Sequence, residues 1–481
     1  MQPLNADDYT TLLPLIILTG WACVLLFLDL FIPKDRKSIT AFLAALGLAV
    51  TLGFTISQIG QENSGFHGMV VLDGFSTFAN VLLLICGLFG VALAHGYIKR
   101  MGIERGEYYT LLLFSVTGMM LMAQATDLII VFLALELLSI PLYVLAAIAR
   151  PNLQSEEAGM KYFLLGAFAT GFVVYGTALI FGATGSTSFS VIVTGGAAGT
   201  SNMFLTLGAA LLLIGFGFKV AAVPFHMWTP DVYQGAPSAV TAFMSSGAKI
   251  AGFVALFRVF VTAFPYLSAD MTGVFWAMSA LTMVVGNVVA ISQTDIKRML
   301  AYSSIAHAGY ILMAFVPYGN PKVLADSVAA GMFYLVAYAF TNFGAWAVVI
   351  AVEKAEGKGL AISDYAGLAR KYPGLAAAMA VFMFSFIGFP PTLGMIGKFY
   401  LFRAAIEGGY TGLAVLGVLT SLVSAFYYLR VVVNMYMREG DVTAEREPWL
   451  AGVTALTAIA TVALSLVPQW LFLLASTAVF K

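Results

Sequence analysis

The chain alternates between long apolar stretches and short polar segments along almost its entire length. A helix needs about 20 predominantly apolar residues to cross the hydrocarbon core of a bilayer. Dividing the sequence at charged residues and at clusters of Gly, Pro and Asn predicts about fourteen such helices. They cover residues 12–32, 39–58, 75–97, 109–125, 128–148, 161–182, 203–223, 238–262, 272–292, 299–317, 326–352, 374–404, 411–437 and 449–475. The expected fold is therefore all-α and integral to a membrane.

The composition agrees with this fold and argues against several classes of function. Of the 481 residues, 60% are hydrophobic and only 10% are charged, whereas a soluble domain carries about 25% charged residues. The 24 basic and 24 acidic residues balance, so no excess of positive charge favours nucleic-acid binding. Cys23 and Cys86 both lie in apolar stretches and predict neither a disulfide framework nor a metal cluster. We expect a lipid bilayer around the chain and no metal or cofactor bound by it.

The basic residues predict how the chain is oriented. Segments on the cytoplasmic side of a membrane are enriched in Lys and Arg. If the N-terminus lies outside, the inside segments hold Lys34, Arg36, Lys37, Lys99, Arg100, Arg105, Arg150, Lys297, Arg298, Lys354, Lys358, Arg370, Lys371, Arg438 and Arg446. The outside segments then hold only Lys322 and Lys481. This bias predicts an even number of spans, with both termini on the outer side.

Two predicted spans, the seventh and the twelfth, contain proline close to a lysine. Pro224 follows Lys219 in the first, and Pro390 and Pro391 precede Lys398 in the second. Proline removes a backbone donor and clashes with the preceding turn. Inside a membrane such a break survives only where protein or water satisfies the freed carbonyls. A single proline kink is common in membrane helices, but interrupted spans at matching places in two halves indicate a transport pathway.

The spacing of the two interrupted spans predicts an internal repeat. They are five spans apart, so spans four to eight and nine to thirteen form two five-helix units. Because five is odd, homologous units would cross the membrane in opposite senses, as an inverted repeat. The predicted division is a three-helix segment at 1–105, repeats at 106–265 and 266–440, and a C-terminal transmembrane helix at 441–481.

Four charged residues lie well inside predicted spans: Glu136, Lys219, Lys249 and Lys398. An unpaired charge at mid-helix costs about 2.5–3.5 kcal/mol on insertion scales, and nothing in folding requires that cost. Burial lowers the pKa of a lysine from about 10.4 by several units, and a nearby carboxylate raises it again. A lysine and a carboxylate whose separation changes are therefore a proton switch. Together the four residues predict proton movement within the membrane.

Other polar residues suit supporting or structural roles. Histidine titrates close to neutral pH, so His226 and His307 suit relay steps between lysines. Lys161 stands at the start of the sixth span, where it either joins the row or extends its ammonium to the membrane surface. Charged residues nearer the helix ends are expected to be interfacial or ion-paired: Asp29, Arg258, Arg403 and Arg430.

Three long motifs resemble a known family. Residues 224–249 (PFHMWTPDVYQGAPSAVTAFMSSGAK) are similar to the signature of the antiporter-like, proton-translocating subunits of NADH:quinone oxidoreductase, the respiratory complex I. Residues 155–167 (SEEAGMKYFLLGA) and 293–310 (QTDIKRMLAYSSIAHAGY) resemble the bacterial subunit N group of that family. The sibling subunit M group carries a glutamate where Lys398 stands. One departure is Gly247-Ala248, where relatives often carry a proline.

The resemblance implies about fourteen helices, two inverted five-helix repeats and discontinuous seventh and twelfth helices. It implies that Glu136 and Lys219 form a modulating pair. Lys249 would be the central relay, and Lys398 the connection toward the outside. Further residues of the polar axis would be Lys161, His226 and His307.

The resemblance also implies an activity, partners and a location. The activity is proton translocation coupled to quinone reduction, with no redox centre in this chain. Flavin, iron–sulfur clusters and quinone are expected on partner subunits. The partners are the other membrane-arm subunits of complex I, including sibling antiporter-like subunits. The location is the cytoplasmic (inner) membrane of a bacterium, with both termini on the periplasmic side.

Three alternatives stay open. A cation/proton antiporter subunit of a multi-subunit Mrp-type complex would share the fold, although residues 155–167 argue against it. A non-conducting scaffold subunit would tolerate neutral residues at 219, 249 and 398. A related complex fed by ferredoxin or formate is the third, because the electron donor binds other chains.

Overall fold

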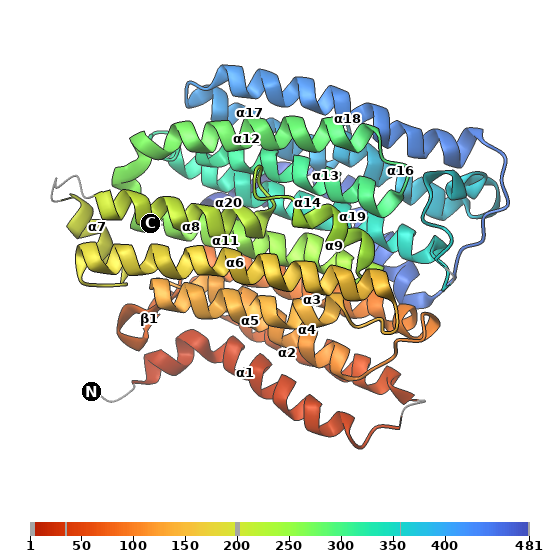
Figure 1. Ribbon diagram of the computed structural model, residues 1–481, viewed down its shortest axis with the longest axis horizontal. Helices are drawn as coiled ribbons and strands as arrows, with labels where there is room; N and C mark the ends of the chain where they lie inside the picture. The colour runs from red at the N-terminus through yellow and green to blue at the C-terminus, as the bar shows by residue number, and fades with distance from the viewer. Residues whose placement is uncertain (1–4, 34–35, 198–202, 356, 480–481) are drawn as a thin grey trace.

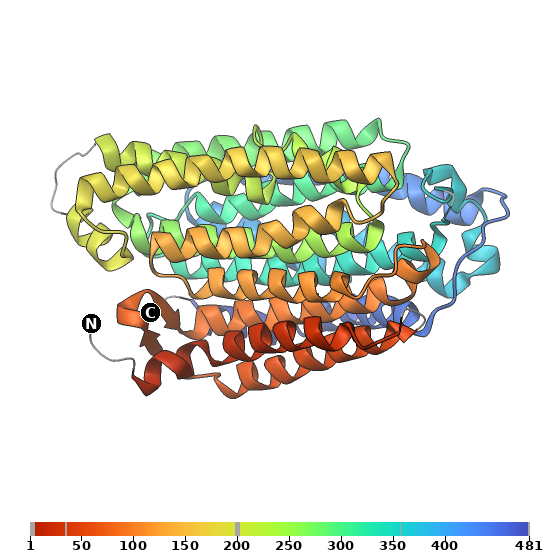
Figure 2. The same ribbon diagram turned by 60° about the horizontal axis from the view of Figure 1, so that its bottom comes forward.

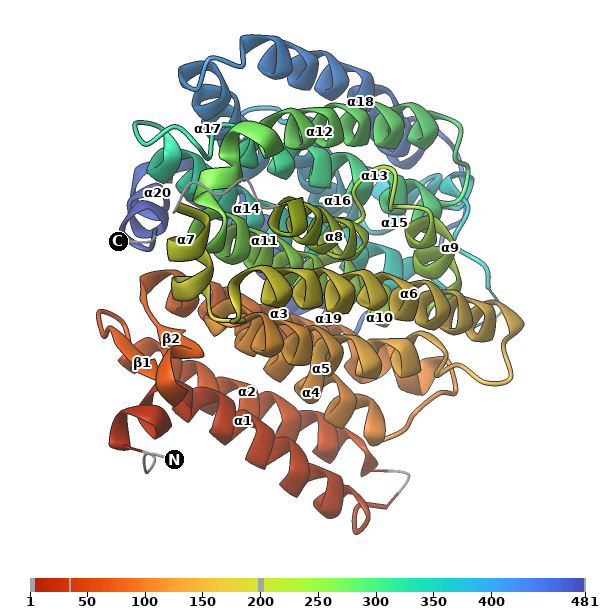
Figure 3. The same ribbon diagram turned by 60° about the vertical axis from the view of Figure 1, so that its left-hand side comes forward.

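The computed structural model describes residues 5–33, 36–197, 203–355 and 357–479, so Lys34, Lys481 and both chain ends lie outside the described residues. The helices run almost parallel in one bundle, with a short β-hairpin at one end (Figure 1). Helices α1 (Ala6–Asp29) and α2 (Ser38–Ser57) form one flank of the bundle. Helices α12 (Ser268–Ile291) and α18 (Thr411–Met437) lie toward the opposite flank (Figure 3).

The hairpin and the other helices follow in chain order. Strands β1 (Asn63–Gly65) and β2 (Val70–Leu72) pair antiparallel, with Asn63 opposite Leu72. The first group of helices is α3 (Gly74–Arg100), α4 (Glu107–Gln124), α5 (Leu128–Ala146), α6 (Leu153–Thr184), α7 (Phe189–Ala197), α8 (Met203–Val220), α9 (Trp228–Gly235), α10 (Ser238–Phe243) and α11 (Lys249–Ala263). The second group is α13 (Ile296–Leu312), α14 (Leu324–Val352), α15 (Leu368–Lys371), α16 (Pro373–Ile387), α17 (Leu393–Glu407), α19 (Pro448–Leu466) and α20 (Pro468–Thr477).

The helices confirm a multi-pass membrane protein. Within the described residues, 11 helices are long and apolar enough to cross a membrane. Helices α4, α13 and the pair α16 and α17 fill the other predicted spans but are shorter or less apolar. Large apolar side chains on the outer helices stay exposed, such as Phe168 and Leu422, as a surface that faces lipid requires. The number fourteen itself stays a prediction.

The two ends of the bundle differ in what they carry. At one end, the start of α1 lies beside the hairpin (Figure 2). There Phe66 donates its backbone N–H to the Asp8 carboxylate, and Gly74 packs on Ala478, which follows α20. The opposite end, here called the basic end, consists of the connecting segments 30–33, 36–37, 101–106, 147–152, 236–237, 292–295, 353–355, 357–372 and 438–447. It holds most of the basic residues that were predicted to face inside.

Both predicted proline breaks are present. Helix α8 stops at Val220, and the chain re-enters a helix at Trp228. Helix α16 stops at Ile387, and α17 begins at Leu393. Ahead of Lys249, residues Met244–Ala248 form a π-helical turn. Such turns are rare and occur often at functional sites.

Helix caps move two predicted boundaries. The Asn152 side chain accepts the backbone N–H groups of Gln154 and Ser155, so α6 begins well before the predicted span at 161. The Asp295 side chain caps α13 in the same way. As a result Lys297, predicted for an inside segment, lies in the first turn of a helix and is 3% exposed. The predicted division into repeats stays a prediction.

Candidate functional site

Three lysines lie deep inside the bundle, each beside an irregular piece of helix. Lys219 ends α8, Lys249 follows the π-helical turn, and Lys398 lies one turn into α17. Their exposed fractions are 5%, 1% and 4%. Among the described residues, no carboxylate lies within ion-pairing distance of any of these ammonium groups. Neutral oxygen atoms accept all of the hydrogen bonds that the ammonium groups donate.

Lys219 is held by hydroxyl groups of two neighbouring helices. Its Nζ donates to Ser139 Oγ on α5 at 2.7 Å and to Tyr162 OH on α6 at 3.3 Å. Tyr162 stacks on Trp228, with 4.6 Å between the ring centroids. Trp228 Nε1 donates in turn to the Phe218 carbonyl at 2.9 Å, and this carbonyl at the end of α8 also accepts the Ala221 backbone N–H at 3.1 Å. The break thus positions the lysine and is itself stabilised by protein groups.

Glu136 and Lys219, the predicted pair, are neighbours without direct contact. Glu136 is half-buried on α5, and its Oε1 accepts from Thr170 Oγ1 on α6 at 2.7 Å. A cavity of about 10 Å³ is bounded by Ser139, Thr170 and Lys219. A cavity of that size is at the lower limit for a single water molecule. Thr170 therefore binds the carboxylate and faces the same small cavity as Lys219, and no ion pair joins Glu136 to Lys219 in this structure.

Lys249 begins α11 and reaches across to α13. Its Nζ donates to both the carbonyl and the hydroxyl of Ser304, each at 2.6 Å. Tyr338 on α14 donates to the same hydroxyl at 2.8 Å. The stem of Lys219 packs against Gly252, one turn further along α11, where a Cβ would lie 3.4 Å from Lys219 Cγ. Lys249 therefore belongs to the face of α11 against which Lys219 packs, one turn away.

His307 lies between the second and third lysines. It is one turn beyond Ser304 on α13, is 3% exposed, and lies within electrostatic reach of Lys249 and Lys398. Its Nδ1 is 2.7 Å from Tyr334 OH, and its Nε2 is 3.1 Å from Tyr428 OH. Both ring nitrogens thus have hydroxyl partners that are able to donate or accept a proton.

Lys398 satisfies the helix break beside it. Its Nζ donates to the carbonyls of Phe386 and Ile387 at 2.9 and 3.0 Å, and to Ser421 Oγ at 2.9 Å. These carbonyls belong to the last turn of α16, which has no helical partner for them. The ammonium also lies 4.4 Å from the centroid of the Tyr310 ring, within cation–π range. Lys398 is therefore both a titratable group and a cap of α16.

The other two predicted relay residues lie apart from this row. The Lys161 side chain is 39% exposed and pairs with Glu157 and Asp231, each at 2.7 Å. Its ammonium is therefore ion-paired and partly exposed, unlike those of the three buried lysines. His226 lies in the break between α8 and α9, is partly exposed, and its Nδ1 has no hydrogen-bond partner among the described residues.

Charged residues near helix ends are bound as expected. Asp29 pairs with Lys37 at 2.7 Å, Arg403 with Glu407 at 2.8 Å, and Arg430 donates to the backbone carbonyls of Ile291 and Gln293. Arg258 donates to both carboxylate oxygens of Asp73 at 2.5 and 2.8 Å. Burial raises the pKa of Asp73, but these bonds and the Arg258 charge outweigh it and hold the pKa below 3.8.

The hydroxyl groups that contact the lysines, Glu136 and His307 were not predicted from the sequence. They are Ser139, Tyr162, Thr170, Ser304, Tyr334, Tyr338, Ser421 and Tyr428. Membrane helices use Ser, Thr and Tyr widely for packing and for hydrogen bonds between helices. A single sequence therefore carries no signal that separates these hydroxyls from the many others. The burial of Lys297 and Glu353 at the basic end was not predicted either.

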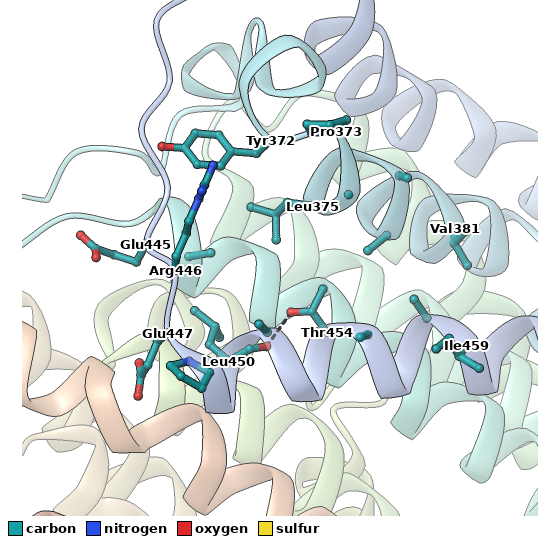
Figure 4. Close-up of a pocket in the computed structure, with 18 of the residues that line it drawn as sticks. Tyr372, Pro373, Leu375, Val381, Glu445, Arg446, Glu447, Leu450, Thr454 and Ile459 are labelled. Carbon is teal, nitrogen blue, oxygen red and sulfur yellow. Dashed lines mark hydrogen bonds between the residues drawn. The ribbon is translucent and has the colours of Figure 1, made fainter.

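A large groove lies away from the lysine row. It has a volume of about 1000 Å³ and runs between α16 and α19, lined mainly by Ala, Leu and Val side chains (Figure 4). At its polar mouth, the Arg446 guanidinium lies 5.2 Å from the centroid of the Tyr372 ring. None of the three buried lysines lines this groove. It is a feature of the apolar outer surface and separate from the candidate site.

The fold and the site together define a class of protein. Interrupted helices that meet titratable side chains in the middle of a helical bundle are typical of membrane transport proteins. Buried lysines bound by hydroxyl and carbonyl oxygens, with His307 within electrostatic reach of two of them, are suited to small cations such as protons. The class is therefore an antiporter-like, multi-pass membrane protein.

Comparison with known proteins narrows the class to one family. The family described as NADH:quinone oxidoreductase/Mrp antiporter, transmembrane, matches residues 125–424. NADH-quinone oxidoreductase subunit N of Trichlorobacter lovleyi is 48% identical over 96% of this chain and 93% of its own length. The protein of the same name from Chloroflexus aggregans is 47% identical, over 97% and 96%. The chain belongs to this family, in its NADH-quinone oxidoreductase subunit N group.

Solved structures agree with this assignment. A chain of respiratory complex I from Thermus thermophilus with bound aureothin superimposes with a TM-score of 0.82 at 36% identity, over 96% of this chain and 99% of that one. A chain of the Mrp complex from Dietzia gives a TM-score of 0.86 at 21% identity, over 99% and 97%. The second likeness, at this low identity, shows the shared fold alone.

Proposed function

We propose that this chain is a proton-translocating membrane subunit of an NADH:quinone oxidoreductase. Its relatives carry the name of subunit N of that enzyme. The observation that carries the proposal is the set of three buried ammonium groups bound only by neutral oxygens. A buried charge without a counter-ion is costly to fold, and proton transfer gives these lysines a role that folding does not.

The proposed path begins at Glu136 and ends beyond Lys398. A change in the distance between Glu136 and Lys219, transmitted from quinone reduction elsewhere in the complex, alters the tendency of Lys219 to hold its proton. The proton passes to Lys249 at the face of α11 that the two lysines share. Ser304, Tyr338 and His307 then carry it toward Lys398. Lys398 connects the row to the end of the bundle where the termini lie.

In this proposal the redox groups of the enzyme are bound by partner chains. Flavin, iron–sulfur clusters and quinone are bound by other subunits. This chain packs beside the other membrane-arm subunits, including sibling antiporter-like chains. It resides in the cytoplasmic membrane of a bacterium, with the basic end toward the cytoplasm, as the positive-inside rule favours. Both termini then lie on the outer side.

The test is a lysine substitution in the assembled complex. Lys219→Ala removes the titratable group, and we expect NADH-driven proton pumping by membrane vesicles to fall strongly while the complex still assembles. Lys322→Ala is the matched control, because Lys322 is exposed in a loop at the other end from the basic segments. Pumping that is unchanged in Lys219→Ala contradicts the proposal.

An Mrp-type cation/proton antiporter subunit is the second candidate, favoured only by the shared fold. The two candidates differ in the chains that accompany this one. Purification of the native complex from membranes with a tag on this chain distinguishes them. Partners that contain flavin and iron–sulfur clusters support the first candidate, and a complex without them supports the second.

A further inference from the structure

A polar cluster outside the lysine row lies at the basic end, where α14 ends. Its central residues are Tyr97 from α3, Lys297 from α13 and Glu353, which follows α14 directly. Their exposed fractions are 2%, 3% and 7%. The next residue, Lys354, is exposed. The cluster is therefore enclosed by protein and one residue away from the surface.

One carboxylate oxygen of Glu353 accepts a hydrogen bond, and the other has no hydrogen-bond partner among the described residues. Its Oε1 accepts from Tyr97 OH at 3.2 Å. Its Oε2 is buried and has no partner among the described residues, and the same is true of Ser238 Oγ and Tyr365 OH nearby. Buried polar groups nearly always have hydrogen-bond partners, so exceptions indicate a bound water or ion, or a functional group.

Several charged and titratable groups surround Glu353. Lys297 donates to the Ala236 carbonyl at 2.7 Å and lies within electrostatic reach of Glu353 without pairing directly with it. The charged or titratable groups that face the cluster from the surrounding elements are Tyr97, Arg100, Asp295, Lys297 and Tyr365.

A stripe of hydroxyl groups leads from this cluster to Lys249. Tyr97 OH accepts the backbone N–H of Ser238, the first residue of α10, at 2.9 Å. From there Ser238, Thr241, Ser245 and Ser246 lie along α10 and the π-helical turn, all of them fully buried. Asn342 on α14 donates to the hydroxyls of Ser245 and Ser246 at 2.7 and 2.8 Å.

The length of the stripe matches half a membrane. From Ser238 to Lys249 the helix rises by about 16 Å, at about 1.5 Å per residue. The hydrocarbon core is about 30 Å thick, so the stripe runs from the basic end to about its middle. The buried hydroxyl groups of the stripe and the Asn342 amide provide successive oxygen atoms that are able to accept a proton along this route.

We propose that Glu353 is the group through which protons enter this chain from the basic end. It takes a proton from water at that surface, and an O–H bond forms at Oε2. That bond breaks when the proton passes into the hydroxyl stripe, and an N–H bond forms on the neutral amine of Lys249. Tyr97 and Lys297 position the carboxylate. This inference rests on the proposed function and adds an entry point to it.

The test uses the isosteric variant Glu353→Gln in the assembled complex, reconstituted in liposomes. A glutamine oxygen still accepts from Tyr97, so a purely structural role survives, whereas proton loading does not. Positioned acid–base groups contribute about 10²-fold or more to rate. We therefore expect NADH-driven proton pumping to fall at least about tenfold, and Glu353→Asp to restore part of it. Glu445→Gln, an exposed carboxylate at the same end, is the control and should pump normally.

Two further measurements separate this inference from the proposed function. Lys249→Met is tested in parallel: if it blocks pumping while Glu353→Gln pumps normally, the entry point is wrong and the proposed function stands. If both variants pump normally, the proposed function is wrong as well. In infrared spectra recorded while pH changes, the wild-type complex should show a carboxyl C=O band that Glu353→Gln lacks and Glu445→Gln keeps. An unchanged band in Glu353→Gln overturns the inference.

Discussion

Replacing Lys249 by methionine should leave the protein as stable as before while proton pumping stops. Methionine has a similar length and no charge, so it fills the space between α11 and α13. The substitution removes an ammonium that is 1% exposed and has no counter-ion among the described residues. Placing a lysine at the centre of a membrane helix costs about 3 kcal/mol, and that cost disappears.

The hydrogen bonds that are lost offset most of this gain. Lys249 donates twice to Ser304, and a net hydrogen bond contributes about 1 kcal/mol. The Ser304 hydroxyl keeps its bond from Tyr338 at 2.8 Å, so it is not left without a partner. The expected change is therefore between zero and about 1 kcal/mol of added stability.

The assay compares heat resistance and activity in the same preparation. The midpoint of thermal unfolding of this chain within the assembled complex is measured beside NADH-driven proton pumping. Lys322→Met, at an exposed position, is the control for the substitution itself. A clear loss of stability together with normal pumping would show that Lys249 is a structural residue and does not transfer protons.

Two other predictions concern the supports of the site and of the bundle. Gly388 has φ +91°, and a Cβ there would lie 3.1 Å from Lys398 Cδ. Gly388→Ala should therefore lower the stability of the protein by about 1–2 kcal/mol. We expect a lower midpoint of thermal unfolding and slower proton pumping. Asp73 has a folded-state pKa below 3.8 because Arg258 outweighs burial, so its stabilising effect should be complete above about pH 4 and lost as pH falls through the lowered pKa. Acid unfolding should therefore be less steep in Asp73→Asn than in the wild type; equal curves would contradict this.

Much of the fold was predictable because hydropathy and proline act locally. Apolar stretches of membrane-spanning length marked the helices, and both proline breaks appear where they were expected, at Pro224 and at Pro390-Pro391. The three lysines stood out because a membrane makes an unpaired charge costly. These signals depend on a residue and its immediate neighbours, which a single sequence contains.

What could not be predicted depends on contacts between distant helices. Lys161 and Lys219 look alike in sequence, yet Asp231, 70 residues further along, binds Lys161 at the surface. The separation between Glu136 and Lys219 depends on how α5, α6 and α8 pack. Lys297 follows a short polar segment and resembles an inside-loop residue, but the Asp295 cap starts the helix earlier and buries it.

The central claim is that the buried lysines must release protons, and Lys219→Arg tests it most directly. Arginine keeps the positive charge and can donate to Ser139 and Tyr162 as lysine does, but it does not deprotonate in proteins. The measurement is the number of protons pumped per NADH oxidised by the reconstituted complex. If the buried lysines must release protons, this ratio, or turnover itself, falls sharply in Lys219→Arg. A ratio and a turnover equal to those of the wild type would contradict it.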